Sequence, residues 1–354
     1  MAEARLTRSS NLEALRIVSM LMVLTVHVDG ASLGLPGPVG DFSQLTDRGL
    51  WRVIVESFAI IGVNCFTLIS GYFGIRLRLA GAVRFLGTAM LYSCAIYLIY
   101  CCVYPWQFSW TGVADSLRVI TRTDLWYVPA YFALMILAPA INGLMDKLPT
   151  YVVPAVVIAV VGVNVAGGWI MGLEFNPTGY TVSQLVMIYM IGRWMRMGVF
   201  ADIDYWQWSD RLRMMVLAIV MYVVTAMGVA YSSTMFEAPK AFAYNSPLVI
   251  VESVAFFMIF VSMKFRSRHV NMLASGAFAV YLIHKSPQVW VGWMKPTVIG
   301  LWNSLSLSQF SVVAVLLILG IYVSCAMIDV VRRRLMAYFW YMKKYRGESI
   351  EYRD

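Results

Sequence analysis

The chain has 354 residues, of which 60% are hydrophobic and 13% are charged. Soluble domains carry about 25% charged residues, so the composition excludes an ordinary soluble enzyme and predicts an all-α integral membrane protein. The net charge of +9 is then a question of where positive residues lie relative to the membrane, and we expect no nucleic acid as a partner.

Ten apolar segments follow one another along the chain, each near the 20 residues that cross about 30 Å of hydrocarbon. We expect residues 1–331 to form one ten-span membrane domain and residues 332–354 a basic, aromatic cytoplasmic tail lying on lipid. The expected spans are 12–31, 53–74, 83–104, 125–144, 151–172, 180–198, 213–232, 247–264, 272–293 and 309–331.

The distribution of Lys and Arg predicts the orientation of these spans. An even number of spans places both termini on one side. Of the 28 Lys and Arg residues, Arg16 and Lys285 lie within spans. If both termini are cytoplasmic, the outside loops hold six: Arg48, Arg52, Arg118, Arg122, Lys240 and Lys295. The remaining twenty lie inside, and this bias predicts that both termini are cytoplasmic.

The first span is the candidate catalytic element, because it carries Glu13, Arg16 and His27. On a helix, the eleven residues from Arg16 to His27 turn about 1100°, so the two side chains face almost the same way, about 16 Å apart along the axis. Ionisable groups within a membrane are costly, which favours a functional site facing a cavity. In the alternative interpretation, Arg16 reaches the headgroups with Glu13 as its partner and His27 packs between helices.

Four further ionisable residues lie within expected spans: Glu56, Glu252, His284 and Lys285. They could line an acceptor pocket or pair with other charges, and both interpretations remain open. The five cysteines lie in apolar runs without metal or redox spacing, so we expect neither a metal site nor a disulfide framework.

Three sequence motifs accompany the Arg16–His27 spacing. They are GVNCFTLISGYFG at 62–74, LWYVPAYFALMILAPAIN at 125–142 and YLIHKSP at 281–287. With these motifs in this order, the chain resembles the acyltransferase-three family of bacterial multi-pass membrane proteins. Within that family it is similar to the branch that O-acylates surface polysaccharides.

This resemblance implies a protein of the bacterial cell membrane that moves an acyl group, usually acetyl, from cytoplasmic acyl-CoA to a sugar hydroxyl. The acyl-CoA is a co-substrate, not a bound cofactor. The acceptor is a polysaccharide or its lipid-linked precursor. Arg16 and His27 match the family's Arg–His motif. The arginines at positions 76, 78 and 84 fall where the family has a cytoplasmic arginine motif, although their spacing differs from the usual pair separated by two residues.

The residues themselves are compatible with acyl transfer. His27 suits a general base near neutral pH, and a transient acyl carrier is the alternative role that the sequence leaves open. Arg16 could hold a phosphate or a carboxylate, with Glu13 holding the arginine in place. The alternative function is a secondary transporter or flippase for a lipid-linked sugar or small anion, which would also have buried charges and a proline-interrupted helix.

Overall fold

The computed structural model describes residues 9–351, and side chains are described up to residue 338. The regular secondary structure of this part of the chain is entirely helical, and it contains no strand. The α-helices and two π-helical turns that matter below are α1 (Ser10–Val28), α2 (Gly30–Leu33), α3 (Asp47–Ala59), α4 (Gly62–Phe73), α5 (Leu79–Val103), α6 (Trp110–Leu117), α7 (Tyr127–Lys147), α8 (Val153–Val163), η3 (Asn164–Ile170), α9 (Val182–Met197), α10 (Trp208–Met235), α11 (Ala238–Ala241), α12 (Pro247–Ser262), α13 (Arg268–Ala274), α14 (Ala277–His284), α15 (Pro287–Val289), η5 (Trp290–Met294), α16 (Lys295–Ser304) and α17 (Leu307–Glu351).

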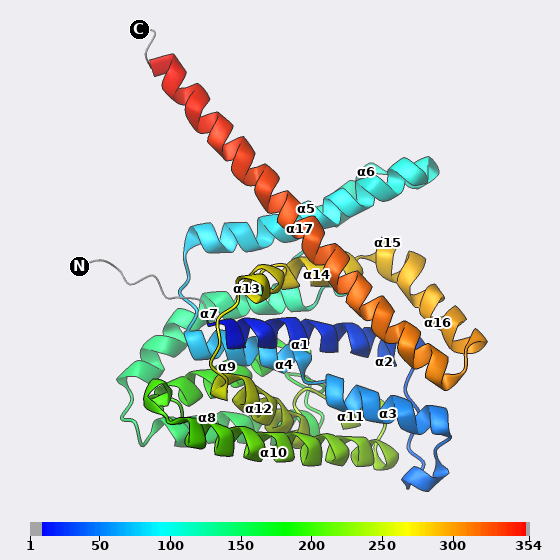
Figure 1. Cartoon of the computed structure of the whole chain (residues 1–354), viewed down its shortest axis with the longest axis vertical. Helices are drawn as coiled ribbons and strands as arrows, with labels where there is room; N and C mark the ends of the chain where they lie inside the picture. Colours follow the sequence, from blue (N-terminus) through cyan, green and yellow to red (C-terminus); the bar gives the residue numbers. More distant parts are fainter. Residues whose placement is uncertain (1–8, 352–354) are drawn as a thin grey trace.

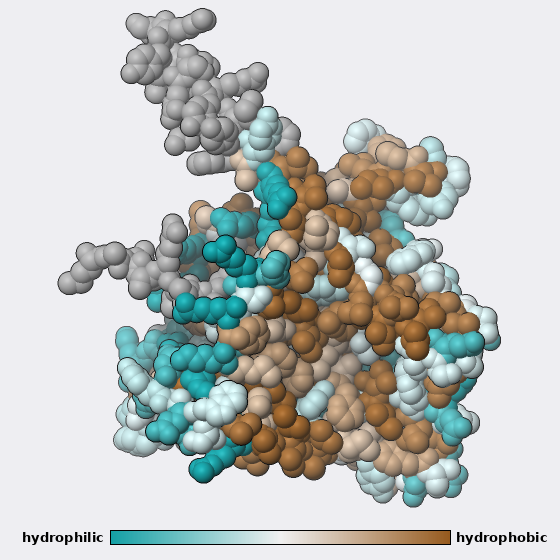
Figure 2. Space-filling view, viewed as in Figure 1, coloured by the Kyte–Doolittle hydropathy of each residue, from teal (hydrophilic) through white to brown (hydrophobic). Residues whose placement is uncertain are grey.

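The all-α membrane architecture is confirmed. Seven helical segments of the described residues are long and apolar enough to cross a membrane, and each coincides with an expected span. Figure 2 shows hydrophobic residues across the middle of the visible face and hydrophilic residues gathered toward its left side, near the N-terminus.

The other three expected spans are helical but short or broken. Helices α9 and α12 have 16 residues each, about 24 Å of helix against about 30 Å of hydrocarbon. The segment 272–293 is divided among α13, α14, α15 and η5. The ten-span count and the cytoplasmic termini therefore stay predictions.

Helix α1 lies in the middle of the bundle (Figure 1). It packs against α4 and α12 on one side and against α13, α14 and α17 on the other. This central position explains how a helix with three ionisable residues is accommodated, because its polar positions face protein or an internal cavity and not lipid.

Helices α4 and α9 approach closely through two glycines. A Cβ atom on Gly71 would lie 2.1 Å from the Tyr189 carbonyl oxygen, and one on Gly192 would lie 2.4 Å from the Leu68 carbonyl oxygen. Small residues at such positions let membrane helices pack backbone to backbone.

Helix α17 continues without a break through position 331, where the sequence predicts the start of a separate tail. Arg332 and Arg333 belong to the same helix as the last expected span. The expected tail contacts beyond residue 338, and the N-terminal arginines Arg5 and Arg8, lie outside the part whose side chains are described.

Candidate functional site: a cavity through the bundle

A cavity of about 770 Å³ lies between α1, α4, α5, α7, α14 and α17. Both Arg16 and His27 line it, as the shared face of α1 predicts. Helix α14 runs beside α1, so contacts between the two helices show which residues lie at each end of the cavity. Ser10 at the start of α1 donates to Asn271 of α13 at 2.9 Å, and His27 near the end of α1 contacts His284, the last residue of α14. Ser275, which lies between Asn271 and His284 in the chain, is therefore placed toward the Arg16 end.

His27 forms a pair with His284. The His27 Nδ1 and His284 Nε2 atoms are 2.9 Å apart, and His284 Nδ1 lies 2.6 Å from the Val280 carbonyl oxygen. A carbonyl oxygen only accepts, so His284 Nδ1 carries the proton in the neutral pair and His284 Nε2 accepts from His27 Nδ1. The lone pair of His27 is then on Nε2, which leaves this nitrogen unprotonated, as a general base requires.

The surroundings of the pair restrict its geometry. His284 is fully buried, whereas His27 is half-buried and faces the cavity. The Trp290 ring lies edge-on to His27 at 5.3 Å between centroids. Lys285 lines the cavity and places its Nζ 4.6 Å from the centroid of the same tryptophan ring. The pair is therefore a fixed polar element in which the His27 imidazole faces the cavity and a cation lies nearby.

Arg16 and Glu13 form an ion pair near the other end of α1. Arg16 Nη1 donates to Glu13 Oε1 at 2.6 Å, and Glu13 is 6% exposed. At about 16 Å along the axis from His27, Arg16 is too distant to contact the same reacting atoms. Arg16 is therefore suited to positioning a ligand along the cavity, and not to contacting the atoms that react at His27.

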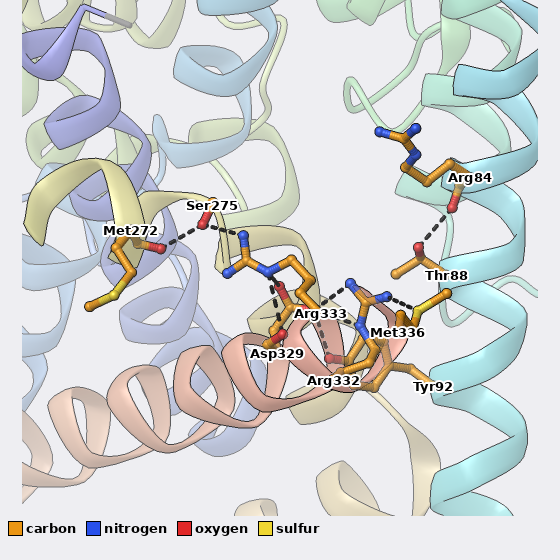
Figure 3. Close-up of polar contacts among 9 residues, drawn as sticks. All are labelled: Arg84, Thr88, Tyr92, Met272, Ser275, Asp329, Arg332, Arg333 and Met336. Carbon is orange, nitrogen blue, oxygen red and sulfur yellow. Dashed lines mark hydrogen bonds and ion pairs between the residues drawn. The ribbon is translucent and has the colours of Figure 1, made fainter. Parts of the chain in front are cut away.

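One end of the cavity is strongly basic, as the arginines in Figure 3 show. Arg84 comes from α5 and Arg332 and Arg333 come from α17, and all three line the cavity. Asp329 forms ion pairs with both α17 arginines, at 2.7 Å to Arg332 and 3.0 Å to Arg333. We call these three arginines, with Asp329 and Ser275, the basic end.

The opposite end is lined by aromatic rings. Trp126 lies 4.8 Å from Tyr180 and 6.1 Å from Tyr244 between ring centroids, and the two tyrosines are 4.9 Å apart. Asp124 and Lys285 line the same region. We call Trp126, Tyr180 and Tyr244 the aromatic end.

A buried network of amide side chains holds the aromatic end. Gln184 Nε2 donates to the Tyr244 carbonyl oxygen at 2.7 Å, and Asn64 Nδ2 donates to the same oxygen at 3.1 Å. Both amide side chains are fully buried. Since unpaired amides are costly inside a bundle, the network fixes the Tyr244 segment against α4 and α9.

The remaining predicted site residues lie outside the cavity lining. Glu56 accepts from the Gly30 backbone N–H at 3.3 Å. Glu252 is fully buried, and neither of its carboxylate oxygens has a partner among the described residues. Arg76 and Arg78 are exposed in the linker between α4 and α5. Of the expected donor-binding arginines, the structure brings Arg84 alone to the cavity.

Some lining residues were not singled out from the sequence as site residues. Tyr131 Oη lies 3.0 Å from Ser70 Oγ, midway along the cavity. The aromatic end combines segments from three separate loops, and no local spacing indicates it. From the sequence alone, Arg332 and Arg333 are counted with the other positive residues of the cytoplasmic side. Their spacing of three and four residues from Asp329 does indicate ion pairs.

Comparison with protein families shows where the chain belongs. Residues 9–329 match the family model described as an acyltransferase domain. No curated protein matches the chain, and no solved structure does. The matched range includes α1 and α14, and therefore the histidine pair, and it ends at Asp329.

Proposed function

The chain belongs to the acyltransferase-3 family, as its motifs predict, and we propose that this membrane acyltransferase moves an acetyl group from cytoplasmic acetyl-CoA to a sugar hydroxyl. The acceptor in this proposal is a cell-surface polysaccharide or its lipid-linked precursor, and the membrane is the bacterial plasma membrane. The observation that carries the proposal is the His27–His284 pair on the wall of a cavity with one basic and one aromatic end.

The proposed chemistry is direct transfer with His27 as general base. His27 Nε2 takes the proton of the acceptor hydroxyl, and the hydroxyl oxygen attacks the thioester carbonyl carbon. Lys285 supplies positive charge near the oxygen on which charge develops. The C–S bond then breaks, the new ester remains on the sugar, and the CoA sulfur leaves with the proton from His27.

His284 serves as the positioning residue for this base. The hydrogen bond that His284 Nδ1 donates to the Val280 carbonyl oxygen fixes the tautomer of His284, which in turn fixes the proton on His27 Nδ1. The arrangement is related to other catalytic histidines that are oriented by a hydrogen bond to the second ring nitrogen.

The two ends of the cavity suit two different substrates. A thioester that enters from the basic end passes Arg16 and reaches His27 along α1. A sugar ring presents apolar faces and hydroxyl edges, which suits the flat rings of the aromatic end together with Asp124. Family membership supports acyl transfer over the transporter alternative.

The test is acetyl transfer by the purified full-length protein. Acetyl-labelled CoA is incubated with the protein and a panel of oligosaccharides, and thiol release and labelled sugar are both measured. We expect sugar-dependent thiol release that His27→Ala lowers by at least about 100-fold. Absence of thiol release from wild-type protein with every acceptor would refute the acetyl-CoA proposal.

A further inference from the structure

Two arginines at the basic end lie beyond the residues that match the family. The match ends at Asp329, and Arg332 and Arg333 follow on the next turn of α17. Figure 3 shows both side chains across an open space from Arg84, which projects from α5. The basic end is thus built where α17 crosses α5, an arrangement visible in Figure 1.

Asp329 holds the α17 arginines in place. It is 3% exposed, pairs with both guanidinium groups, and accepts from Tyr92 Oη of α5 at 2.9 Å. Arg333 Nη1 also donates to Ser275 Oγ at 2.6 Å. Since two helices fix these contacts, the guanidinium groups are oriented before any ligand arrives.

The basic end has an excess of positive charge. Three guanidinium groups face one carboxylate, and among the described residues Arg84 forms no ion pair. Planar guanidinium forks match the oxygens of phosphate groups, and several of them together suit a diphosphate better than a single carboxylate.

We propose that Arg332 and Arg333, together with Arg84, bind the diphosphate of the CoA thioester. This assignment rests on the proposed acyl-CoA donor. The pantetheine arm has about 13 chain atoms, which at extended-chain geometry span roughly 15 Å. Ser275, which accepts from Arg333, lies nine residues before His284, about 14 Å at the rise of a helix. Since His284 contacts His27, an extended pantetheine arm that starts from a diphosphate at the basic end is long enough to bring the thioester to His27.

A second hollow supports this placement. It has a volume of about 500 Å³, adjoins the cavity through Ser275 and Arg333, and is lined by Arg268 and Arg334. It provides space and positive charge for the nucleoside and the third phosphate of CoA outside the cavity. The phosphate chemistry would also suit the headgroup of an anionic phospholipid, so the experiment separates the two sources.

The test measures binding of radiolabelled CoA to the full-length protein in phosphatidylcholine nanodiscs. Loss of one charge-assisted contact weakens binding about 10- to 100-fold, so we expect R84Q and the double variant R332Q/R333Q each to raise the Kd for CoA at least 10-fold. In turnover, both should raise the KM for acetyl-CoA more than they lower kcat. Arg213 is exposed on α10 and lines neither hollow, so R213Q is the matched control for loss of charge.

The outcomes separate this assignment from the proposed function. The double variant leaves Asp329 without its partners, so its thermal melting is measured as well; Arg84 forms no such pair, and R84Q tests the site without that complication. Wild-type binding of CoA that neither R84Q nor R332Q/R333Q weakens would overturn the arginine assignment alone. Loss of co-purified phosphatidylglycerol from R332Q/R333Q with unchanged CoA affinity would assign the site to lipid and also overturn it. No CoA binding by wild-type protein would overturn the acyl-CoA donor and this assignment together.

Discussion

At the scale of single residues, the proposed chemistry depends on which ring nitrogen of His27 is free. Two successive hydrogen bonds determine which nitrogen is free: His284 Nδ1 donates to the Val280 carbonyl oxygen, and His284 Nε2 accepts from His27 Nδ1. Removing His27 and removing His284 should therefore have different effects, since one removes the base and the other only its orientation.

His27→Ala should lower acyl transfer by at least about 100-fold, because general bases contribute roughly 10²–10⁴-fold. CoA binding should persist. His284→Ala should lower kcat by a smaller factor, since His27 remains but loses its fixed tautomer. The double variant should be little worse than His27→Ala, because the two residues act as a unit. The measurement is kcat for labelled acetyl transfer, and near wild-type turnover by His27→Ala would end its assignment as the base.

The Glu13–Arg16 pair either positions the donor or serves helix packing alone, and one variant can separate these two interpretations. Glu13 is buried, so Arg16→Ala alone leaves an uncompensated carboxylate and should destabilise the protein. The neutral double variant Glu13→Gln, Arg16→Gln removes that cost while keeping similar side-chain volumes. If Arg16 positions the donor, the double variant should melt like wild type but remain impaired in transfer, with a raised KM for acetyl-CoA. Restored transfer would mean that the pair serves packing alone. Arg16→Lys should also be impaired, since it keeps the charge but loses the planar fork.

At the scale of helices, the close packing of α4 and α9 is the most exacting feature. Gly71→Ala and Gly192→Ala should each lower stability by about 1–3 kcal/mol, the usual cost of overpacking a filled interface, because their Cβ atoms would meet backbone carbonyl oxygens. Gly87→Ala in α5 is the control, since its Cβ would meet nothing within 4 Å. Thermal unfolding in one detergent is the measurement. Equal melting of all three variants would show that α4 and α9 are not packed this closely.

Hydropathy and segment length predicted every long membrane helix, because about 20 apolar residues have few alternatives to a spanning helix. The same pattern does not show whether a shorter helix crosses the whole bilayer. Helices α9 and α12 have 16 residues each and are largely buried, so their crossing of the membrane stays a prediction. The division of 272–293 was only partly visible, through Pro287.

The candidate site was predictable where it depends on one helix and not where it depends on packing. Helical geometry placed Arg16 and His27 on one face of α1, and spacing placed Glu13 beside Arg16. The His27–His284 contact joins positions 257 apart in the chain, and only the packing of α14 on α1 brings them together. The meeting of Arg84 with the α17 arginines likewise depends on a helix crossing.

At the scale of the whole molecule, the orientation in the membrane decides which substrate meets which end of the cavity. The bias of positive residues predicts that Lys147 and the C-terminus are cytoplasmic and that Asp41 lies outside. Alkaline phosphatase and green fluorescent protein fusions at these three positions should report accordingly. A cytoplasmic signal at Asp41 would contradict the orientation and the ten-span count.

The two ends of the cavity should be accessible from opposite sides of the membrane. Tyr180 is 49% exposed at the aromatic end, and Arg84 lines the basic end. In a background in which the exposed Cys102 is replaced by serine, a membrane-impermeant maleimide should label Tyr180→Cys in intact cells. It should label Arg84→Cys only in inverted vesicles. Bound CoA should slow labelling of Arg84→Cys and leave Tyr180→Cys unaffected, because the donor occupies the basic end and stops at His27. Labelling of both positions from the same side would show that the cavity opens to one face, and the acceptor would then have to enter by the same route as the donor.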